Sequence, residues 1–187
     1  MKKHGVFALL LIMLSTSAWA VPTSKTCMDT LERFRNLAET NSFLNQAVGY
    51  AILPTIGKGG IIVLGGAYGE GCVFKGGTRT GAVKMAQATI GFQFGGQAYS
   101  QLIIFKSQDA YDSFTSGSFE FGADASAVAL THGAQASAGT KGASASANEK
   151  SGGAQWFRGM AVFTLAKGGL MYEAAIGGQK FEFLPGE

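Results

Sequence analysis

The segment GKGGIIVLGGAYGEGCVFKGGTRTG, residues 57–81, decides the fold that the sequence predicts. It opens a stretch, residues 57–99, that holds 13 of the 28 glycines. Runs of β-forming residues lie among and after these glycines, at 61–64, 68–75, 89–94 and 102–105. Glycine inside strands accompanies bulges, sharp bends or close approach of two backbones. We therefore expect a coiled, glycine-rich antiparallel β-sheet, sandwich- or barrel-like, with a turn at residues 75–81.

Helical patterns lie on both sides of this stretch. Residues 24–47 repeat apolar side chains every three or four positions, which predicts a leading amphipathic helix and, from Ser42, a second short one. Ser107 is a cap residue for one short middle helix that buries Ala110, Tyr111 and Phe114. Three further strands, joined by two Gly-Gly hairpin turns, are expected at 156–165, 170–175 and 179–184. The predicted class is α+β, with about seven to nine strands.

Residues 122–154 consist mainly of Ala, Gly and Ser, and two interpretations stay open. A flexible linker is the first, because such sequences bury little. A thin hairpin is the second, because alanine alternates with polar residues on both sides of the possible turn at 139–142.

Residues 1–20 are predicted to form a secretory signal peptide. Lys2 and Lys3 precede a short apolar run at 7–13, and Ala18-Trp19-Ala20 places small residues where a signal peptidase reads them. We expect this signal peptide to direct the protein to the periplasm, and its cleavage to leave a single domain, residues 21–187.

Composition excludes two broad classes. Charged residues make up 14% and hydrophobic residues 47%, whereas disordered chains are highly charged and poorly hydrophobic. Beyond residue 20 the chain keeps 13 Lys and Arg against 12 Asp and Glu, so attraction to nucleic acid is not expected.

The sequence offers few of the residues that common enzyme active sites require. His132 is the one histidine beyond residue 20, which leaves a zinc site or a Ser-His-Asp triad without partners. The glycines of 66–71 have the reverse spacing of a dinucleotide-binding loop. Glu70 and Glu173 could do acid–base work only if they met, so a hydrolase is a third and minor hypothesis. We expect no catalytic residue, no cofactor and no metal site.

Cys27 and Cys72 are the two cysteines of the chain. An oxidising destination favours a disulfide between them over two buried free thiols.

Basic residues occur in two groups that could contact phosphate. The glycine-rich region carries Lys58, Lys75, Arg79 and Lys84, and the leading helix carries Lys25, Arg33 and Arg35. Together with apolar side chains such as Phe34, they would supply what a membrane-surface site requires, namely apolar area and attraction to anionic headgroups. Scattered solubilising charges are the alternative.

Several ordered motifs resemble those of the SYLF domain family. Residues 47–54 (AVGYAILP), 57–60 (GKGG) and 65–71 (GGAYGEG) are similar to its opening, and the later glycine-rich and apolar motifs, up to 168–178, follow in the same order. The resemblance covers about residues 30–184. It implies phospholipid binding without catalysis, often through a leading amphipathic helix with basic residues nearby.

Within this resemblance, Lys58 matches the lysine of the family's Lys-Gly-Gly segment, and the helix around Arg33, Phe34 and Arg35 takes the place of the lipid-contacting helix. Some eukaryotic members bind phosphoinositides and actin, which are not expected outside a bacterial cytoplasm. The hypothesis is therefore a phospholipid-binding protein of the bacterial cell envelope that associates with membrane. The alternative is a structural or partner-binding envelope protein without a lipid ligand, whose protein partner is unknown.

We predict that the mature chain begins at Val21, because the Ala-Trp-Ala tripeptide fits the geometry of signal peptidase. The intact mass of the protein extracted from the cell envelope measures this directly. A retained or lipid-modified N-terminus would contradict both the processing and the periplasmic location.

Overall fold

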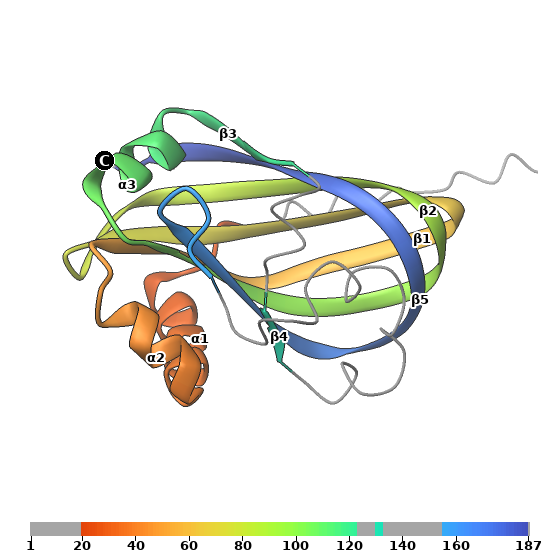
Figure 1. Cartoon of the computed structure of the whole chain (residues 1–187), viewed down its shortest axis with the longest axis horizontal. Coiled ribbons are helices and arrows are strands. Elements are labelled where there is room, and N and C mark those ends of the chain that lie inside the picture. Colours follow the sequence, from red (N-terminus) through yellow and green to blue (C-terminus); the bar gives the residue numbers. More distant parts are fainter. Residues whose placement is uncertain (1–19, 123–129, 133–154, 187) are drawn as a thin grey trace, which may run out of the picture.

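The computed structural model describes residues 20–122, 130–132 and 155–186. Over these residues the elements follow in the order α1 (Ser24–Arg35), α2 (Ala38–Leu44), β1 (Gly49–Lys75), β2 (Thr78–Phe105), α3 (Gln108–Thr115), β3 (Ser118–Phe121), β4 (Leu130–His132) and β5 (Met160–Pro185) (Figure 1). The expected α+β class, with a bent antiparallel sheet and leading and middle helices, is confirmed.

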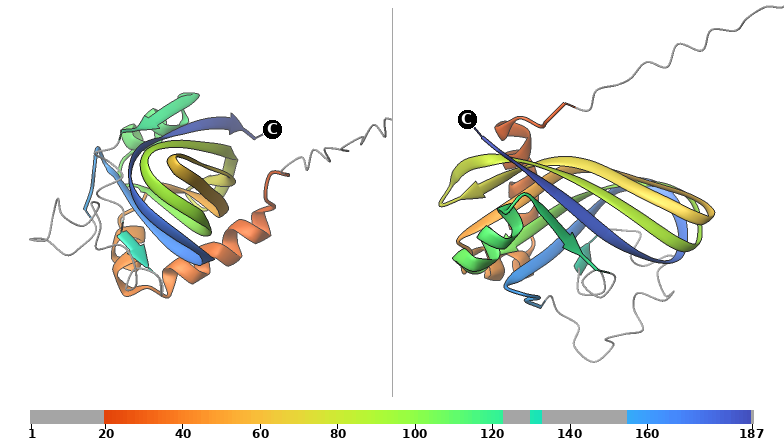
Figure 2. Two further views of the ribbon diagram at one scale, coloured as in Figure 1. Left: turned by 90° about the vertical axis from the view of Figure 1, so that its right-hand side faces the viewer. Right: turned by 90° about the horizontal axis from the view of Figure 1, so that it is seen from above.

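Three very long strands dominate the sheet. β1, β2 and β5 have 27, 28 and 26 residues, several times the usual length of about five or six. The strand order is β1-β2-β5-β3, with β4 also paired to β5. All of these pairs are antiparallel except β4 with β5. The long strands bend together into nested arcs, with β1 innermost and β5 outermost (Figure 2).

Over the described residues the structure has five strands, fewer than the seven to nine predicted. The glycine-rich runs up to residue 105 belong to β1 and β2 alone, and the three runs after residue 156 all belong to β5. Most of the glycines that were expected to separate short strands instead let long strands bend, since a residue without Cβ adopts backbone angles that others avoid. The tight turn predicted at residues 75–81 is present between β1 and β2. Its two central residues, Gly76 and Gly77, have positive φ angles of 56° and 82°, which glycine adopts readily.

The two halves of β1 lie in backbone contact. A Cβ added to Gly71 would come 2.1 Å from the carbonyl oxygen of Ile52, and one added to Gly49 would come 2.5 Å from that of Phe74. No larger residue fits either place without moving backbone. The innermost strand can fold back on itself this closely because these positions are glycine.

Two hydrophobic clusters stabilise the sheet. The first includes residues from β1, β2, β3, β5 and α3, among them Phe105, Phe114 and Phe181. The second lies between the sheet and the leading helices and includes Leu31, Phe34 and Phe163. Side chains from the two faces of the sheet thus serve separate clusters.

The helices begin and end close to where the sequence predicted, with one difference. Ser107 caps α3, since its Oγ accepts a hydrogen bond of 3.3 Å from the amide of Ala110. The break between α1 and α2 falls at residues 36–37, and α2 begins at Ala38 after Leu37, five residues before the start that a Ser42 cap predicts.

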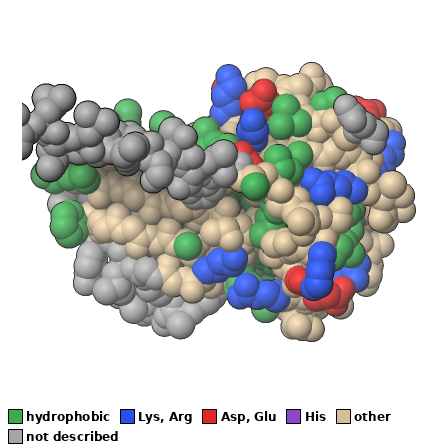
Figure 3. Space-filling view, turned by 180° about the vertical axis from the view of Figure 1, so that it is seen from behind, with side chains coloured by type: hydrophobic (Ala, Val, Ile, Leu, Met, Phe, Trp, Pro, Cys, Tyr) green, Lys and Arg blue, Asp and Glu red, His purple; other side chains and the backbone are tan. Residues whose placement is uncertain are grey.

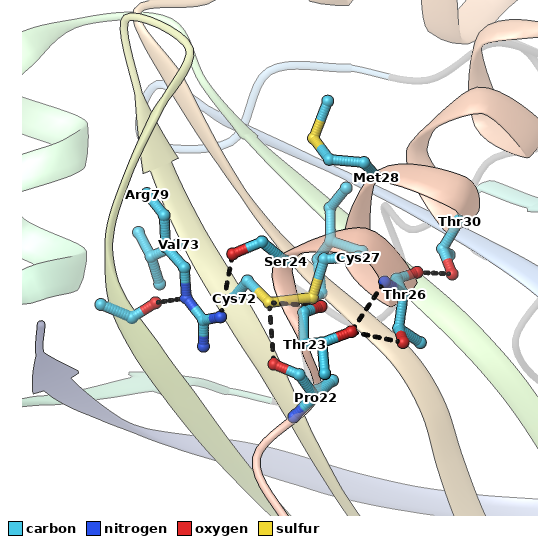
Figure 4. The surroundings of a disulfide bond; sticks show 12 residues. Pro22, Thr23, Ser24, Thr26, Cys27, Met28, Thr30, Cys72, Val73 and Arg79 are labelled. Atoms are coloured by element: carbon cyan, nitrogen blue, oxygen red, sulfur yellow. Dashed lines mark hydrogen bonds between the residues drawn. A yellow bond between two sulfur atoms is a disulfide. The ribbon is translucent and has the colours of Figure 1, made fainter.

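A disulfide ties α1 to the sheet. Cys27 of α1 and Cys72 of β1 are both fully buried, and their sulfur atoms are 2.03 Å apart (Figure 4). Beside the bridge, Arg79 Nη1 donates a hydrogen bond of 3.1 Å to Ser24 Oγ, which links the β1–β2 hairpin to the first turn of α1. The expected signal peptide, residues 1–20, and the hairpin or linker of 122–154 lie outside the described residues, except for Ala20, Gly122 and β4.

We predict that Gly71→Ala lowers the free energy of unfolding by about 1–3 kcal/mol, because its Cβ would overlap the backbone at Ile52. Gly59→Ala, in the same strand, is the matched control, since its Cβ would lie 3.8 Å from the nearest atom, the carbonyl oxygen of Gly95. The control should stay within about 1 kcal/mol of wild type. Chemical denaturation measures both, and equal effects would contradict the proposed close approach.

The disulfide is expected to stabilise the native state by ~4 kcal/mol, because it closes a loop with a sequence separation of 45 residues. Thiol labelling of the denatured, unreduced protein should find no free cysteine. Replacing Cys27 and Cys72 by Ser should lower the midpoint of chemical denaturation. Two labelled thiols per chain would refute the bridge.

Candidate functional site

Six large apolar side chains are exposed where β1 and β2 bend. They are Ile61, Ile62, Val63 and Leu64 of β1 and Ile90 and Phe94 of β2, which we name the apolar tip, and their exposed fractions run from 57% to 73%. The strand register places Phe94 opposite Ile61 and Ile90 opposite Leu64, so the residues of the two strands are neighbours. Exposed apolar residues are ordinary when scattered, but a contiguous group marks an interaction surface.

The apolar tip is exposed on both faces of the sheet. Successive residues of a strand point to opposite faces, and here four successive residues of β1 are all exposed. The register shifts between Ile62 and Leu64, and Ile62 has a φ of 58°. This backbone conformation is strained for a β-branched residue, and such strain is found at functional sites. A flat protein partner would cover one face, whereas a fluid apolar medium surrounds both.

One face of the molecule shows how the visible charged side chains are distributed (Figure 3). Seen from behind, hydrophobic side chains lie over the narrow end of the molecule, and the visible Lys and Arg side chains lie on the wider part (Figure 3). Acidic side chains also lie on the wider part. On this face, the described charged side chains thus gather on the wider part of the molecule.

On α1, two of the basic residues expected to bind lipid are paired within the helix. Lys25 Nζ lies 2.6 Å from an Asp29 oxygen, and Arg35 Nη1 lies 2.8 Å from a Glu32 oxygen. Both ion pairs are exposed to solvent and therefore weak, so each basic side chain can leave its acidic partner for another anion.

Other basic residues of the predicted site lie elsewhere on the sheet. Lys75 Nζ lies 5.0 Å from the centre of the Tyr111 ring, and Arg79 bonds to Ser24. Lys84 has an acidic residue at the paired position of each neighbouring strand. Lys58 lies three residues before Ile61 in β1 and is half-buried. The structure thus distributes the predicted residues over α1, the β1–β2 hairpin and the base of the apolar tip.

Phe34 is a core residue in the structure. Its side chain is fully buried in the cluster between α1 and the sheet, together with Leu31 and Phe163. The apolar stripe of α1 faces the sheet, so the expectation that Phe34 contacts lipid from the helix surface is corrected. Amphipathic periodicity shows that a helix has an apolar face, but it does not say what covers that face.

Lys167 and Thr55 form a contact that the sequence did not indicate. The sequence predicts a hairpin turn at Lys167, but the residue lies inside β5. Gly168 pairs with Ala98 of β2 and Ala166 pairs with Tyr99, so Lys167 is a bulge residue without a pairing partner in β2. Its Nζ donates a hydrogen bond of 2.7 Å to Thr55 Oγ1 of β1. Burial, and then the positive charge of Arg33, lower the pKa of Lys167.

The two acids considered for acid–base chemistry do not share a site. Glu70 is buried and accepts a hydrogen bond of 2.7 Å from Tyr68, which, with burial, raises the pKa of Tyr68 to about 12. In the strand register, Glu70 is opposite Lys84 of β2 and Glu173 is opposite Gln93 of β2. Lys84 and Gln93 are nine positions apart in β2. At about 3.3 Å per residue, that is roughly 30 Å of strand.

The apolar tip itself was missed as a surface. Residues 61–64 were interpreted as an ordinary strand, yet a signal was present, since Gly-Gly pairs bracket these four apolar residues at 59–60 and 65–66. The glycines that flank the run along the chain contribute no side chains that could cover it.

Comparison with known proteins identifies a family. A family model named Ysc84, described as "Las17-binding protein actin regulator", matches residues 86–182, just over half of the chain. Neither the curated proteins nor the solved structures gave a significant match. Within the described residues, the helices are too short or too polar to span a membrane.

Proposed function

This chain belongs to the Ysc84 family, whose domain is also called SYLF, and we propose that it is a non-catalytic phospholipid-binding protein of the bacterial cell envelope. The family match confirms the resemblance found in the sequence, and it supports a binding role. The lipid ligand and the envelope location are our proposal. The single observation that carries it is the apolar tip, exposed on both faces of the sheet.

Membrane contact accounts for the chemistry of the apolar tip. Burying one aliphatic side chain contributes about 1.5–3 kcal/mol, and the apolar tip offers six large apolar side chains. Part of this gain offsets the loss of translational and rotational freedom on binding. The remainder is enough for reversible attachment at the boundary between headgroups and acyl chains.

The envelope location and the absence of catalysis have separate support. The predicted signal peptide would deliver the domain to the periplasm, where lipid bilayers lie on both sides. Glu70 is buried against Tyr68, and its backbone position is far along the sheet from that of Glu173, so these acids do not form an acid–base pair.

A protein-binding role is the second candidate. The description of the family names Las17 binding and actin regulation, both of which are interactions with protein. In this chain the corresponding role would be contact with an envelope protein that covers the apolar tip. Such a protein would need a cleft that encloses both faces of the bend.

We predict that Ile61→Asp with Leu64→Asp weakens binding to phospholipid vesicles about 100-fold or more. Two aliphatic side chains lose their burial, each worth about 1.5–3 kcal/mol, and every 1.4 kcal/mol corresponds to about tenfold in affinity. Vesicle flotation with the mature protein measures the binding. Asn45→Asp with Ser113→Asp adds the same charge at two exposed positions away from the bend and should bind as wild type does.

Circular dichroism and the melting temperature establish that the variants are folded, which we expect because Ile61 and Leu64 are already exposed. Wild-type protein that fails to float with vesicles of any phospholipid would reject lipid binding and favour the protein partner. Equal binding by the Ile61→Asp/Leu64→Asp variant and wild type would reject the apolar tip as the contact.

A further inference from the structure

We propose that the buried carboxylate of Glu70 is a binding site for the α-ammonium group of the mature chain, which cleavage after Ala20 creates at Val21. The resulting ion pair holds the start of the leading helix against the sheet. The proposal rests on the predicted cleavage and is independent of lipid binding, so it goes beyond the function proposed above.

Glu70 carries an unsatisfied hydrogen-bond acceptor. The residue is only 7% exposed, and Tyr68 donates a hydrogen bond of 2.7 Å to its Oε1. Within the described residues, the second carboxylate oxygen, Oε2, is buried and has no hydrogen-bond partner. Burying a carboxylate oxygen without a donor or a counter-ion is costly, so such an atom indicates a cationic group that completes the site.

The basic side chains nearest to Glu70 do not supply this cation. Lys84 is opposite Glu70 in the register of β2, yet no ion pair joins the two among the described residues. Arg79 donates its hydrogen bond to Ser24 of α1, and Lys25 pairs within the helix. These described side chains therefore leave Oε2 without a counter-ion.

The chain that precedes α1 runs along β1 toward Glu70. Ser24 accepts a hydrogen bond from Arg79, whose level in the β1–β2 hairpin is two residues nearer the turn than that of Cys72. Two residues earlier in the chain, the carbonyl oxygen of Pro22 lies 3.6 Å from Cys72 Sγ. Figure 4 shows Pro22 beside Cys72 on the side away from Arg79. Going toward the N-terminus, the chain thus moves along β1 in the direction of Glu70.

The nitrogen of Val21 is within reach of the Glu70 carboxylate. Glu70 and Cys72 are two positions apart in an unbroken part of the register, so their side chains share one face, roughly 7 Å apart. The Val21 nitrogen is less than two residues of chain from the Pro22 carbonyl, which is at most about 7 Å. Val21 is 42% exposed, so core packing does not hold it away from the carboxylate.

Cleavage changes the chemistry of this nitrogen. In the uncleaved chain it belongs to a neutral amide, which has one N–H donor. In the mature chain it becomes a primary ammonium with a full charge and three donors. Charge-assisted hydrogen bonds to a carboxylate are roughly twice as strong as neutral ones, so Glu70 gains a matching partner only when the signal peptide is removed.

Two links between the leading helix and the sheet then form only after export. The disulfide from Cys27 to Cys72 requires an oxidising compartment, and the ammonium requires signal peptidase. Before export, α1 is held by its apolar contacts and by the hydrogen bond from Arg79 to Ser24. The domain therefore reaches its full stability in the compartment where we propose that it acts.

The test compares two chains with the disulfide intact, both made by specific proteolysis. One begins at Val21, and the other keeps residues 18–20, which moves the ammonium by roughly 10 Å of chain. Near neutral pH, the unfolding equilibrium constant of the extended chain should be about tenfold or more larger, because hydrogen bonds to charged groups contribute most. With Glu70→Gln, the two chains should agree within about twofold, because a neutral amide forms no ion pair.

Glu182→Gln is the matched control. Glu182 is opposite Lys84 in β5, as Glu70 is in β1, and it is exposed. In this background the extension should keep its full cost. Glu70→Gln retains the shape of the side chain and an acceptor for Tyr68, and circular dichroism establishes that both variants are folded.

The α-amino group gives a second and direct readout. Nuclear magnetic resonance titration of the Val21 chain should place its pKa above the ordinary value of an α-amino group, because a nearby carboxylate favours the charged form. The pKa should return to that ordinary value in Glu70→Gln. Tyr68 does not titrate in the same range, since its hydrogen bond to Glu70, and then burial, raise its pKa to about 12. The added stability is complete at neutral pH and is lost as the pH rises through the raised pKa of the ammonium.

Three results would overturn the proposal. The extension costs the wild-type chain less than about twofold, its cost persists in Glu70→Gln, or Glu182→Gln removes it. A natural protein whose intact mass shows a first residue other than Val21 would also reject the site. These measurements use no vesicle, so their failure leaves lipid binding by the apolar tip to its own test.

Discussion

The structure depends on the close contact between the two halves of β1. At Gly49 and Gly71 the backbone of one half touches the backbone of the other, with no room for a Cβ. Because β1 is the innermost of the nested arcs, its curvature sets the curvature of β2 and β5, which pair with it in sequence across the sheet. A larger side chain at these positions would open the bend and separate the faces that pack in the core.

Tight bending has a consequence at the opposite end of the sheet. Where β1 and β2 bend, the chain places Ile61–Leu64 with glycines on both sides, and these four side chains are exposed. A soluble protein normally avoids a contiguous exposed apolar group of this kind, since it invites aggregation. Its presence on a strained segment, with Ile62 at positive φ, indicates that the surface is used.

The leading helix is held as part of the core. Its apolar stripe, including Leu31 and Phe34, is buried against the sheet, and the disulfide from Cys27 to Cys72 fixes it there. The exposed side of α1 carries its basic residues Lys25, Arg33 and Arg35. A helix held in this way cannot turn its apolar face outward without breaking the core.

The sequence by itself determined the α+β class, the β1–β2 turn at Gly76 and Gly77, the Ser107 cap and the family, because each follows from local chemistry or from ordered motifs. Only the tertiary structure decided how many strands there are, since a glycine pair can make a turn or a bend and the choice depends on what packs against it. It also decided which apolar residues are core and which are surface. Phe34 and Ile61 look alike in the sequence, yet one meets the sheet and the other meets solvent. Lys167 and Thr55, 112 residues apart, come together only because two bulges in different strands face each other across β2.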